Sequence, residues 1–212
     1  MSSSITITIS RQIGCGGAYI GQEVAKSLGC RYLDREIVRH VANHLKEDES
    51  LLIDRQERIS SFWENLVRSC SVCIPETGYI PPPVRPIMDS ELFAVEALII
   101  RKIAERYSSV IVGRGAFHIL SDISGLVNVF LHATPEFRLR RVMDVFDIKD
   151  SEKAKNLIED SDRQRRKFIR VLSGRDWTDA RNYHLSIDTG VVGFADACEM
   201  ILCRAKTLLA ER

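Results

Sequence analysis

Apolar residues follow two different periods along the 212-residue chain, and these periods predict strands that alternate with helices. At the start, isoleucine alternates with threonine or serine over residues 5–10, which is typical of a strand. Short apolar runs predict further strands at residues 30–33, 110–112, 126–131 and 185–187. Strands separated by helices form a parallel sheet that is covered on both faces. The pattern therefore predicts an α/β fold with a five-stranded parallel sheet.

Between these strands, apolar residues recur at helical spacing. Ile20, Val24 and Leu28 lie four residues apart, and Gly29 follows them as a helix C-cap. Large aromatic side chains dominate burial, so Trp177 and Tyr183 are interpreted as packing residues, with stacking on a base as the alternative. Further helices are predicted over residues 36–45, 90–103, from Pro135 onward, 151–172 and 194–209.

Residues 46–90 interrupt the alternation. A polar segment at residues 46–50 precedes a helical stretch that ends near residue 68. The segment at residues 75–86 is rich in proline, with three consecutive prolines at 81–83, and cannot form a helix or a central strand. A chain of 212 residues is typical of one domain, so we interpret 46–90 as an insert within a single domain spanning residues 1–212.

Composition and charge are those of an ordinary globular protein and argue against a membrane-spanning, secreted or nucleic-acid-binding protein. Hydrophobic residues make up 45% of the chain, charged residues 28%, and the net charge is only +1, which gives no global field for nucleic acid or membranes. The sequence has no apolar run of membrane-spanning length and no secretory signal at its start. Its six cysteines include one C-x-x-C pair, Cys70 and Cys73, without a second ligand pair at zinc-site spacing. We therefore expect a cytoplasmic protein with reduced thiols.

A glycine-rich segment follows the first predicted strand and opens the first predicted helix. Gly14, Gly16 and Gly17 would let backbone amides surround a phosphate at the helix N-terminus; the alternative is a structural turn. The segment departs from the standard phosphate loop, Gly-x-x-x-x-Gly-Lys-Ser/Thr, because Gly17 stands at the lysine position and Ala18 at the Ser/Thr position. We expect Arg11, at the end of the strand, to supply the missing positive charge.

Several segments occur in the same order as in a known family. They are Ser10–Gly17 followed by Ile20-Gly21; Tyr32-Leu33-Asp34; Val110–Ala116; Val129-Phe130-Leu131 with Arg138 and Arg141; Asp162, Arg165 and Phe168; and Tyr183-His184-Leu185 with Ile187-Asp188-Thr189. Together they resemble the cytidylate kinase-like family over nearly the whole chain. The least covered part lies near residues 46–88.

The resemblance implies a P-loop NTPase fold with three α/β/α layers, similar to adenylate kinase. It implies a nucleotide kinase that uses ATP and Mg²⁺ and phosphorylates a nucleoside monophosphate, with CMP or dCMP as the named acceptor. Residues 46–90 would form the acceptor-side insert, and residues 150–172 would form a lid. The implied partners are small-molecule nucleotides, with no nucleic acid and no membrane, and the metal ligands stay undefined.

The loop and the resemblance together predict three groups of site residues. The ATP and phosphate group is Ser10, Arg11, Gly14, Cys15, Gly16, Gly17, Ala18 and Tyr19. The catalytic group is Arg11, Asp34, Arg163 and Arg165. The acceptor group is Asp34, Arg114, Arg138, Arg141, Asp162 and Arg166.

Each charged residue also has a structural interpretation. Asp34 is equally suited to capping a helix that starts at residue 36. Arg138 and Arg141 share a helix face and would equally form salt bridges with nearby carboxylates. Arg163, Arg166 and Arg170 line one side of the predicted long helix, as a solvated face does, whereas Arg165 points elsewhere.

Two functions remain open from the sequence. The retained arginines favour an active kinase, because phosphoryl transfer depends on positioning and charge neutralisation. The missing lysine and Ser/Thr favour a nucleotide-binding sensor or interaction module on the same fold. In addition, Gly115 follows Arg114 where cytidylate kinases carry aspartate, which leaves recognition of the acceptor base undefined.

Overall fold

The computed structural model describes residues 4–34, 38 and 90–211. The predicted helix over 36–45 lies outside the described residues except for Val38, and so does the proposed insert except for Ser90. The C-x-x-C pair also lies outside them. The four cysteines within the described ranges, Cys15, Cys30, Cys198 and Cys203, are free thiols.

Five parallel strands form one sheet in the order β2-β3-β1-β4-β5. This confirms the predicted α/β fold and its five-stranded parallel sheet. Register pairs Ile9 with Val112 and His132 with Asp188, so the carboxyl ends of the strands meet at one edge. The strands are β1 (Thr6–Arg11), β2 (Arg31–Leu33), β3 (Ser109–Val112), β4 (Leu126–His132) and β5 (Leu185–Asp188).

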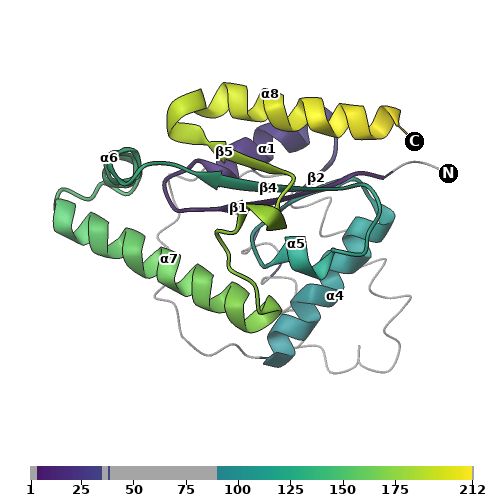
Figure 1. Cartoon of the computed structure of the whole chain (residues 1–212), viewed down its shortest axis with the longest axis horizontal. Helices are drawn as coiled ribbons and strands as arrows, with labels where there is room; N and C mark the ends of the chain where they lie inside the picture. Colours follow the sequence, from purple (N-terminus) through teal and green to yellow (C-terminus); the bar gives the residue numbers. More distant parts are fainter. Residues whose placement is uncertain (1–3, 35–37, 39–89, 212) are drawn as a thin grey trace.

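Helices cover both faces of the sheet (Figure 1). One face carries α1 (Gly17–Leu28) and α8 (Thr189–Ala210), and the other carries α4 (Ser90–Arg106) and α5 (Ala116–Ile119). The carboxyl edge faces α6 (Pro135–Val145) and the long α7 (Ser151–Ser173), and a 3₁₀ turn, Ala180–Asn182, precedes β5. In the described part of the chain, no helix combines the length and apolar character needed to cross a bilayer.

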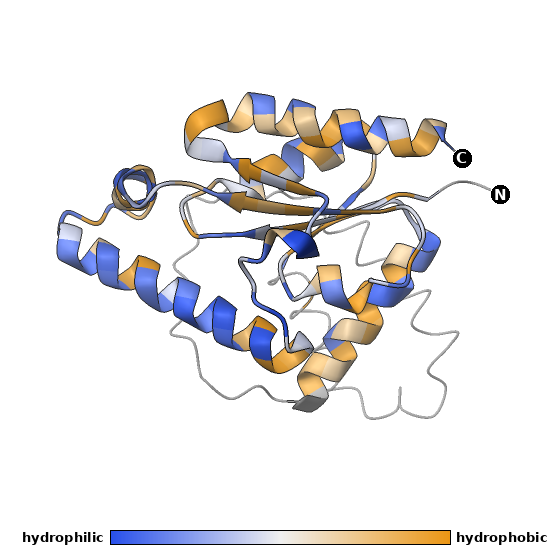
Figure 2. Cartoon of the chain, in the orientation of Figure 1, coloured by the Kyte–Doolittle hydropathy of each residue, from blue (hydrophilic) through white to orange (hydrophobic). Residues whose placement is uncertain are grey.

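The central strand is buried on both faces, although its sequence alternates between apolar and polar residues. Ile7 and Ile9 pack into the core shared with α1 and α8. Thr8 lies on the opposite face, where its hydroxyl donates a 2.6 Å hydrogen bond to the Asn128 side chain of β4. The alternation therefore marks an apolar and a hydrogen-bonded face, both covered by helices. Figure 2 shows the contrast with α7, which is largely hydrophilic.

An aromatic cluster joins the C-terminal part of α7 to the sheet. It comprises Phe117, Phe130, Ile169, Trp177 and Tyr183. Trp177 is 2% exposed, and its backbone carbonyl accepts a 2.7 Å hydrogen bond from the Tyr183 hydroxyl. Burial raises the pKa of Tyr183 to about 12, so the hydroxyl stays a neutral donor. The packing role predicted for both aromatic residues is confirmed.

We expect Tyr183→Phe to lower the free energy of unfolding by about 1–2 kcal/mol, because the buried Trp177 carbonyl loses its donor. Urea unfolding checks this value. Tyr19→Phe is the matched control, since Tyr19 is 48% exposed. Equal stability of the two variants would contradict the assigned hydrogen bond.

Candidate functional site

The glycine-rich loop connects β1 to α1 at the carboxyl edge of the sheet. Gly14 and Gly16 adopt left-handed conformations, with φ of 86° and 70°, which favour glycine. Gly16 is the N-cap of α1, and among the described residues no side chain caps it. The first backbone N–H groups of a helix lack intrahelical acceptors, so this turn is suited to an anion.

Atoms of other segments approach the three loop glycines so closely that larger residues would not fit. A Cβ on Gly14 would lie 3.1 Å from the Arg138 carbonyl oxygen, and one on Gly16 would lie 2.7 Å from the Phe194 ring. A Cβ on Gly17 would lie 2.6 Å from Cγ of Arg11. The aliphatic part of Arg11 therefore fills the space above the position where the standard loop carries lysine.

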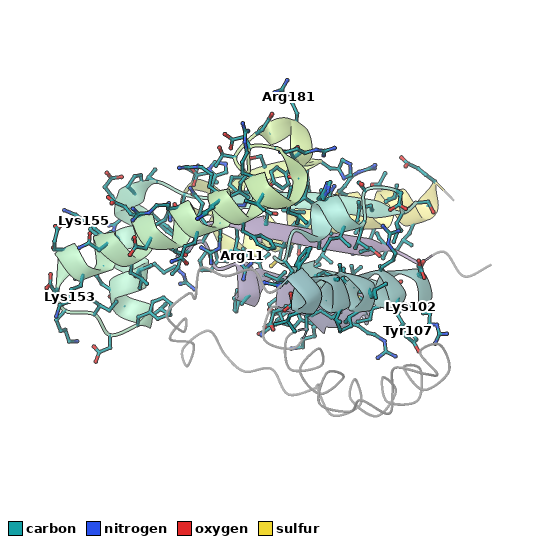
Figure 3. All side chains as sticks on the ribbon, turned by 90° about the horizontal axis from the view of Figure 1, so that it is seen from below. Arg11, Lys102, Tyr107, Lys153, Lys155 and Arg181 are labelled. Atoms are coloured by element: carbon teal, nitrogen blue, oxygen red, sulfur yellow. The ribbon has the colours of Figure 1, made fainter. Side chains whose placement is uncertain are left out.

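Arg11 reaches from the loop towards the end of β3. Its guanidinium lies against Gly113, where a Cβ would collide with Nη1 of Arg11. Figure 3 shows Arg11 near the end of β1, well separated from Lys153 and Lys155 in the N-terminal part of α7. A cation is thus held between the glycine-rich loop and the neighbouring strand end.

Asp34 follows β2 at the same edge of the sheet. The Tyr32 hydroxyl donates a 3.4 Å hydrogen bond to Oδ2 of Asp34, and the Val38 N–H donates to the Asp34 backbone carbonyl. The second bond has the spacing of a helical turn, so Asp34 lies at the start of such a turn. Its carboxylate is half-buried.

The turn after β3 has three successive left-handed residues. Gly113, Arg114 and Gly115 have φ of 87°, 54° and 67°. Arg114 forms an ion pair with Glu96 of α4, whose side chain is 1% exposed. The sequence analysis missed Glu96, although its spacing of four residues from Leu92 and from Ile100 places it on the apolar side of the helix.

Arg138 lies beneath the loop as a buried cation. Its Nε donates a 2.9 Å hydrogen bond to the Ile13 carbonyl, and its Nη2 lies 2.8 Å from Oδ2 of Asp162 on α7. The Arg138 side chain is 5% exposed. Two residues predicted for the acceptor thus form a buried ion pair that joins the loop to α7.

The Cys15 side chain points into the core, not towards the loop opening. Burial raises the pKa of its thiol to about 12, so the thiol stays neutral. Cys15 is therefore able to contact an anion only through its backbone. The side chain of Ser10 is also turned inward, where it hydrogen-bonds Tyr183.

A second missed residue, Phe194, lies beside Gly16. It follows Gly193, which kinks α8 with φ 79° and ψ 168°. The guanidinium carbon of Arg141 lies 4.3 Å from the centre of the Phe194 ring, and the Tyr19 ring lies 6.0 Å from it. Arg141, predicted for the acceptor, therefore borders the glycine-rich loop. In the sequence, the only indication of the kink that brings Phe194 to this position is Gly193.

The arginines of α7 divide between two faces. Arg165 is half-buried and donates a hydrogen bond to the Ser161 hydroxyl, on the side of the helix that also carries Asp162. Arg163 is exposed and pairs with Asp160. Arg166 and Arg170 are exposed as well. The structure thus places Arg165 facing the body of the protein and Arg163 and Arg166 on the solvated face.

The residues fit a nucleotide–Mg²⁺ complex through the loop amides, Arg11 and one carboxylate. Within residues 4–34, 38 and 90–211, no three His, Cys, Asp or Glu side chains form a metal-binding group. Mg²⁺ bound to nucleotide phosphates takes only one or two protein carboxylates and keeps several waters. Asp34 and Asp188 both lie at this edge of the sheet, at the ends of β2 and β5.

Comparisons with known proteins agree with this geometry. The family model described as the cytidylate kinase-like family matches residues 6–191. A crystal structure described as an uncharacterized protein from Eubacterium ventriosum has a TM-score of 0.70 at 22% identity, with 96% of this chain and 99% of that chain covered. Shikimate kinase from Bacteroides thetaiotaomicron has a TM-score of 0.52 at 14% identity, with 98% and 99% covered. These likenesses show that the chain shares its fold with both structures, one of which is a shikimate kinase. No curated protein matches the chain.

We expect Arg138→Met to lower the free energy of unfolding by about 3 kcal/mol, because it leaves Asp162 and the Ile13 carbonyl without their buried cation. Chemical denaturation measures the change. Arg140→Met on the same helix is the control and should stay within about 0.5 kcal/mol of the wild type, because Arg140 is exposed. If both variants lose the same stability, Arg138 does not join the loop to α7.

Proposed function

The chain belongs to the cytidylate kinase-like family, and from this membership we propose that it transfers the γ-phosphoryl group of ATP to a nucleoside monophosphate, CMP or dCMP. One observation carries the proposal: the Arg11 guanidinium lies between the glycine-rich loop and the end of β3. In parallel α/β sheets, ligands bind beyond the carboxyl ends of the strands. A cation held there is able to contact donor and acceptor phosphates at the same time.

We assign the donor phosphates to the loop. The amides of Gly14, Cys15, Gly16, Gly17, Ala18 and Tyr19 would surround them, and the N-terminus of α1 would add positive potential. Arg11 replaces the lysine of the standard loop, with its stem lying over Gly17. Arginine is suited to this position because its planar fork is able to hold two phosphate oxygens and stays charged.

We assign the transfer step to Arg11 and Arg165. Bound Mg²⁺ would neutralise part of the phosphate charge, with Asp34 as its protein ligand or as the residue that orients the acceptor. The transferred group spreads negative charge over its oxygens in the transition state, so arginines that face it lower the barrier. The orientation of Arg165 towards the protein body supports this role, and so does the resemblance of Asp162, Arg165 and Phe168 to the lid pattern of the family. The acceptor phosphate is already an anion and requires no strong general base.

The acceptor would lie near Arg114, beyond the end of β3. Arg114 has a left-handed backbone between two glycines, and the space beside these glycines is filled by Arg11 and by Leu172. We therefore assign contact with the acceptor to the Arg114 side chain. Cytidylate kinases carry aspartate at the position of Gly115, so this position does not define which base the acceptor nucleotide carries. A direct assay of all common ribo- and deoxyribonucleoside monophosphates with ATP and Mg²⁺ therefore tests the proposal.

A second function follows from one observation, the absence of the lysine and Ser/Thr side chains at Gly17 and Ala18. In that case, the chain would bind nucleotides without transferring a phosphoryl group. Nucleotide binding measured by calorimetry, together with no turnover for any monophosphate, would support this second function and refute the kinase.

We expect Arg11→Met to weaken ATP binding by about 1.5–3 kcal/mol, the value of a hydrogen bond to a charged group, while the aliphatic packing on Gly17 is kept. Isothermal titration calorimetry measures the affinity. Arg31→Met is the control, because Arg31 stacks on Tyr107 at the amino edge of the sheet. An unchanged ATP affinity in Arg11→Met would remove Arg11 from the site.

We expect Arg165→Ala to lower kcat by about 10³-fold, as for other arginines that stabilise the transition state, while the Kd for ATP changes little. Both quantities are measured on the same purified variant. Arg170→Ala is the matched control on the exposed face of α7 and should keep its turnover within about threefold of the wild type. Equal kcat values in the two variants would place Arg165 outside the chemistry.

A further inference from the structure

A buried carboxylate lies next to the acceptor end of the proposed site. Glu96 is 1% exposed and belongs to the side of α4 that also carries the buried Ile99, Ile100 and Ile103. An ionised carboxylate in apolar surroundings needs a charged or hydrogen-bonding partner. Its partner is Arg114, which the chain presents from the turn after β3.

Three side chains hold the Arg114 guanidinium in place. Glu96 pairs with it, and the rings of Phe93 and Phe168 lie 5.7 and 5.3 Å from its central carbon. The two rings contact each other edge to face at 5.6 Å, where the C-terminal end of α7 reaches the N-terminal part of α4 (Figure 1). Cations over aromatic faces are attracted by the ring quadrupole, so the rings favour the same orientation as Glu96.

The backbone of Arg114 shows that this orientation is imposed by its surroundings. Its φ of 54° is unfavourable for a residue with a Cβ. Such conformations persist only where neighbouring contacts determine them, and they occur often at binding sites. The preceding residue, Gly113, contacts the guanidinium of Arg11, so the two arginines project from the ends of two neighbouring strands, β1 and β3.

We propose that Glu96 is a positioning residue for acceptor recognition: it fixes the Arg114 guanidinium as a directed hydrogen-bond donor to the acceptor nucleotide. This inference rests on the proposed kinase function. The Glu96–Arg114 pair carries no net charge, so Arg114 would contribute hydrogen bonds in a fixed direction. Arg11 and Arg165 would contribute the positive charge that the phosphates need. Removal of the Glu96 charge leaves a partly buried cation that turns away from its present position.

The test is the kinetics of Glu96→Gln, which keeps the shape of the side chain and removes its charge. We expect KM for the acceptor monophosphate to rise at least about tenfold, while kcat and the Kd for ATP stay within about threefold, since the lost contact is made in the ground state and in the transition state alike. Glu105→Gln is the matched control: it makes the same chemical change on the same helix at an exposed position.

Two further variants keep the test decisive if Glu96→Gln does not fold. Glu96→Asp retains the charge on a shorter side chain, and we expect its acceptor KM to lie between those of the wild type and Glu96→Gln. The double variant Glu96→Met/Arg114→Met replaces the pair with apolar side chains, a change that buried ion pairs often tolerate. We expect it to fold, to bind ATP with wild-type affinity and to show the raised acceptor KM.

The outcomes separate this inference from the kinase proposal. Wild-type turnover together with an unchanged or lowered acceptor KM in the Glu96 variants would overturn the positioning role and leave the kinase intact. A fall in kcat with an unchanged acceptor KM would also overturn it. If the wild type transfers no phosphoryl group to any monophosphate, both the kinase function and the role of Glu96 are refuted.

Discussion

The buried cation of Arg138 is the interaction on which the geometry of the site depends. It satisfies a backbone carbonyl of the glycine-rich loop and pairs with a carboxylate of α7, so one side chain fixes two elements that are far apart in the sequence. Gly14 packs directly on the Arg138 backbone, which makes α6 the floor of the loop. A phosphate-binding loop must hold its amides in place before the ligand arrives, because preorganised donors lose no energy to rearrangement. Arg138 supplies that rigidity from the side of α6, while Phe194 and Arg11 pack on Gly16 and Gly17.

The position of Arg11 follows from the same constraint. In a standard loop, lysine extends from the first turn of the helix. In this chain the first turn carries glycine, and an arginine from the preceding strand lies across the vacated space. The charge therefore comes from the sheet, which is more rigid than a helix terminus. With Arg11 in place of the lysine, a cation remains at the strand ends, although the standard phosphate-loop motif is absent from the sequence.

Local patterns were sufficient to predict the five strands, the parallel sheet, the long helix over 151–172 and the packing of Trp177 and Tyr183. The helix predicted over 194–209 agrees with the larger part of α8, which spans Thr189–Ala210. The first turn of α8 and the kink at Gly193 were not predicted, because a single glycine does not reveal a change of direction. Within the site, glycine spacing identified the loop. It did not reveal Glu96 and Phe194, whose partners lie 18 and 178 residues away in the sequence. The division of the arginines on α7 depends on which side of the helix meets the sheet, and only tertiary packing decides that.

The contact between Phe194 and Gly16 has a consequence for how the protein matures. The glycine-rich loop is synthesised 178 residues before Phe194 of α8. Contacts with such a large separation in sequence form late, because the chain must first close a long loop. A nascent chain would therefore contain the complete loop sequence well before that loop acquires its final shape. The glycine-rich loop then reaches its folded shape only after α8 has docked against Gly16.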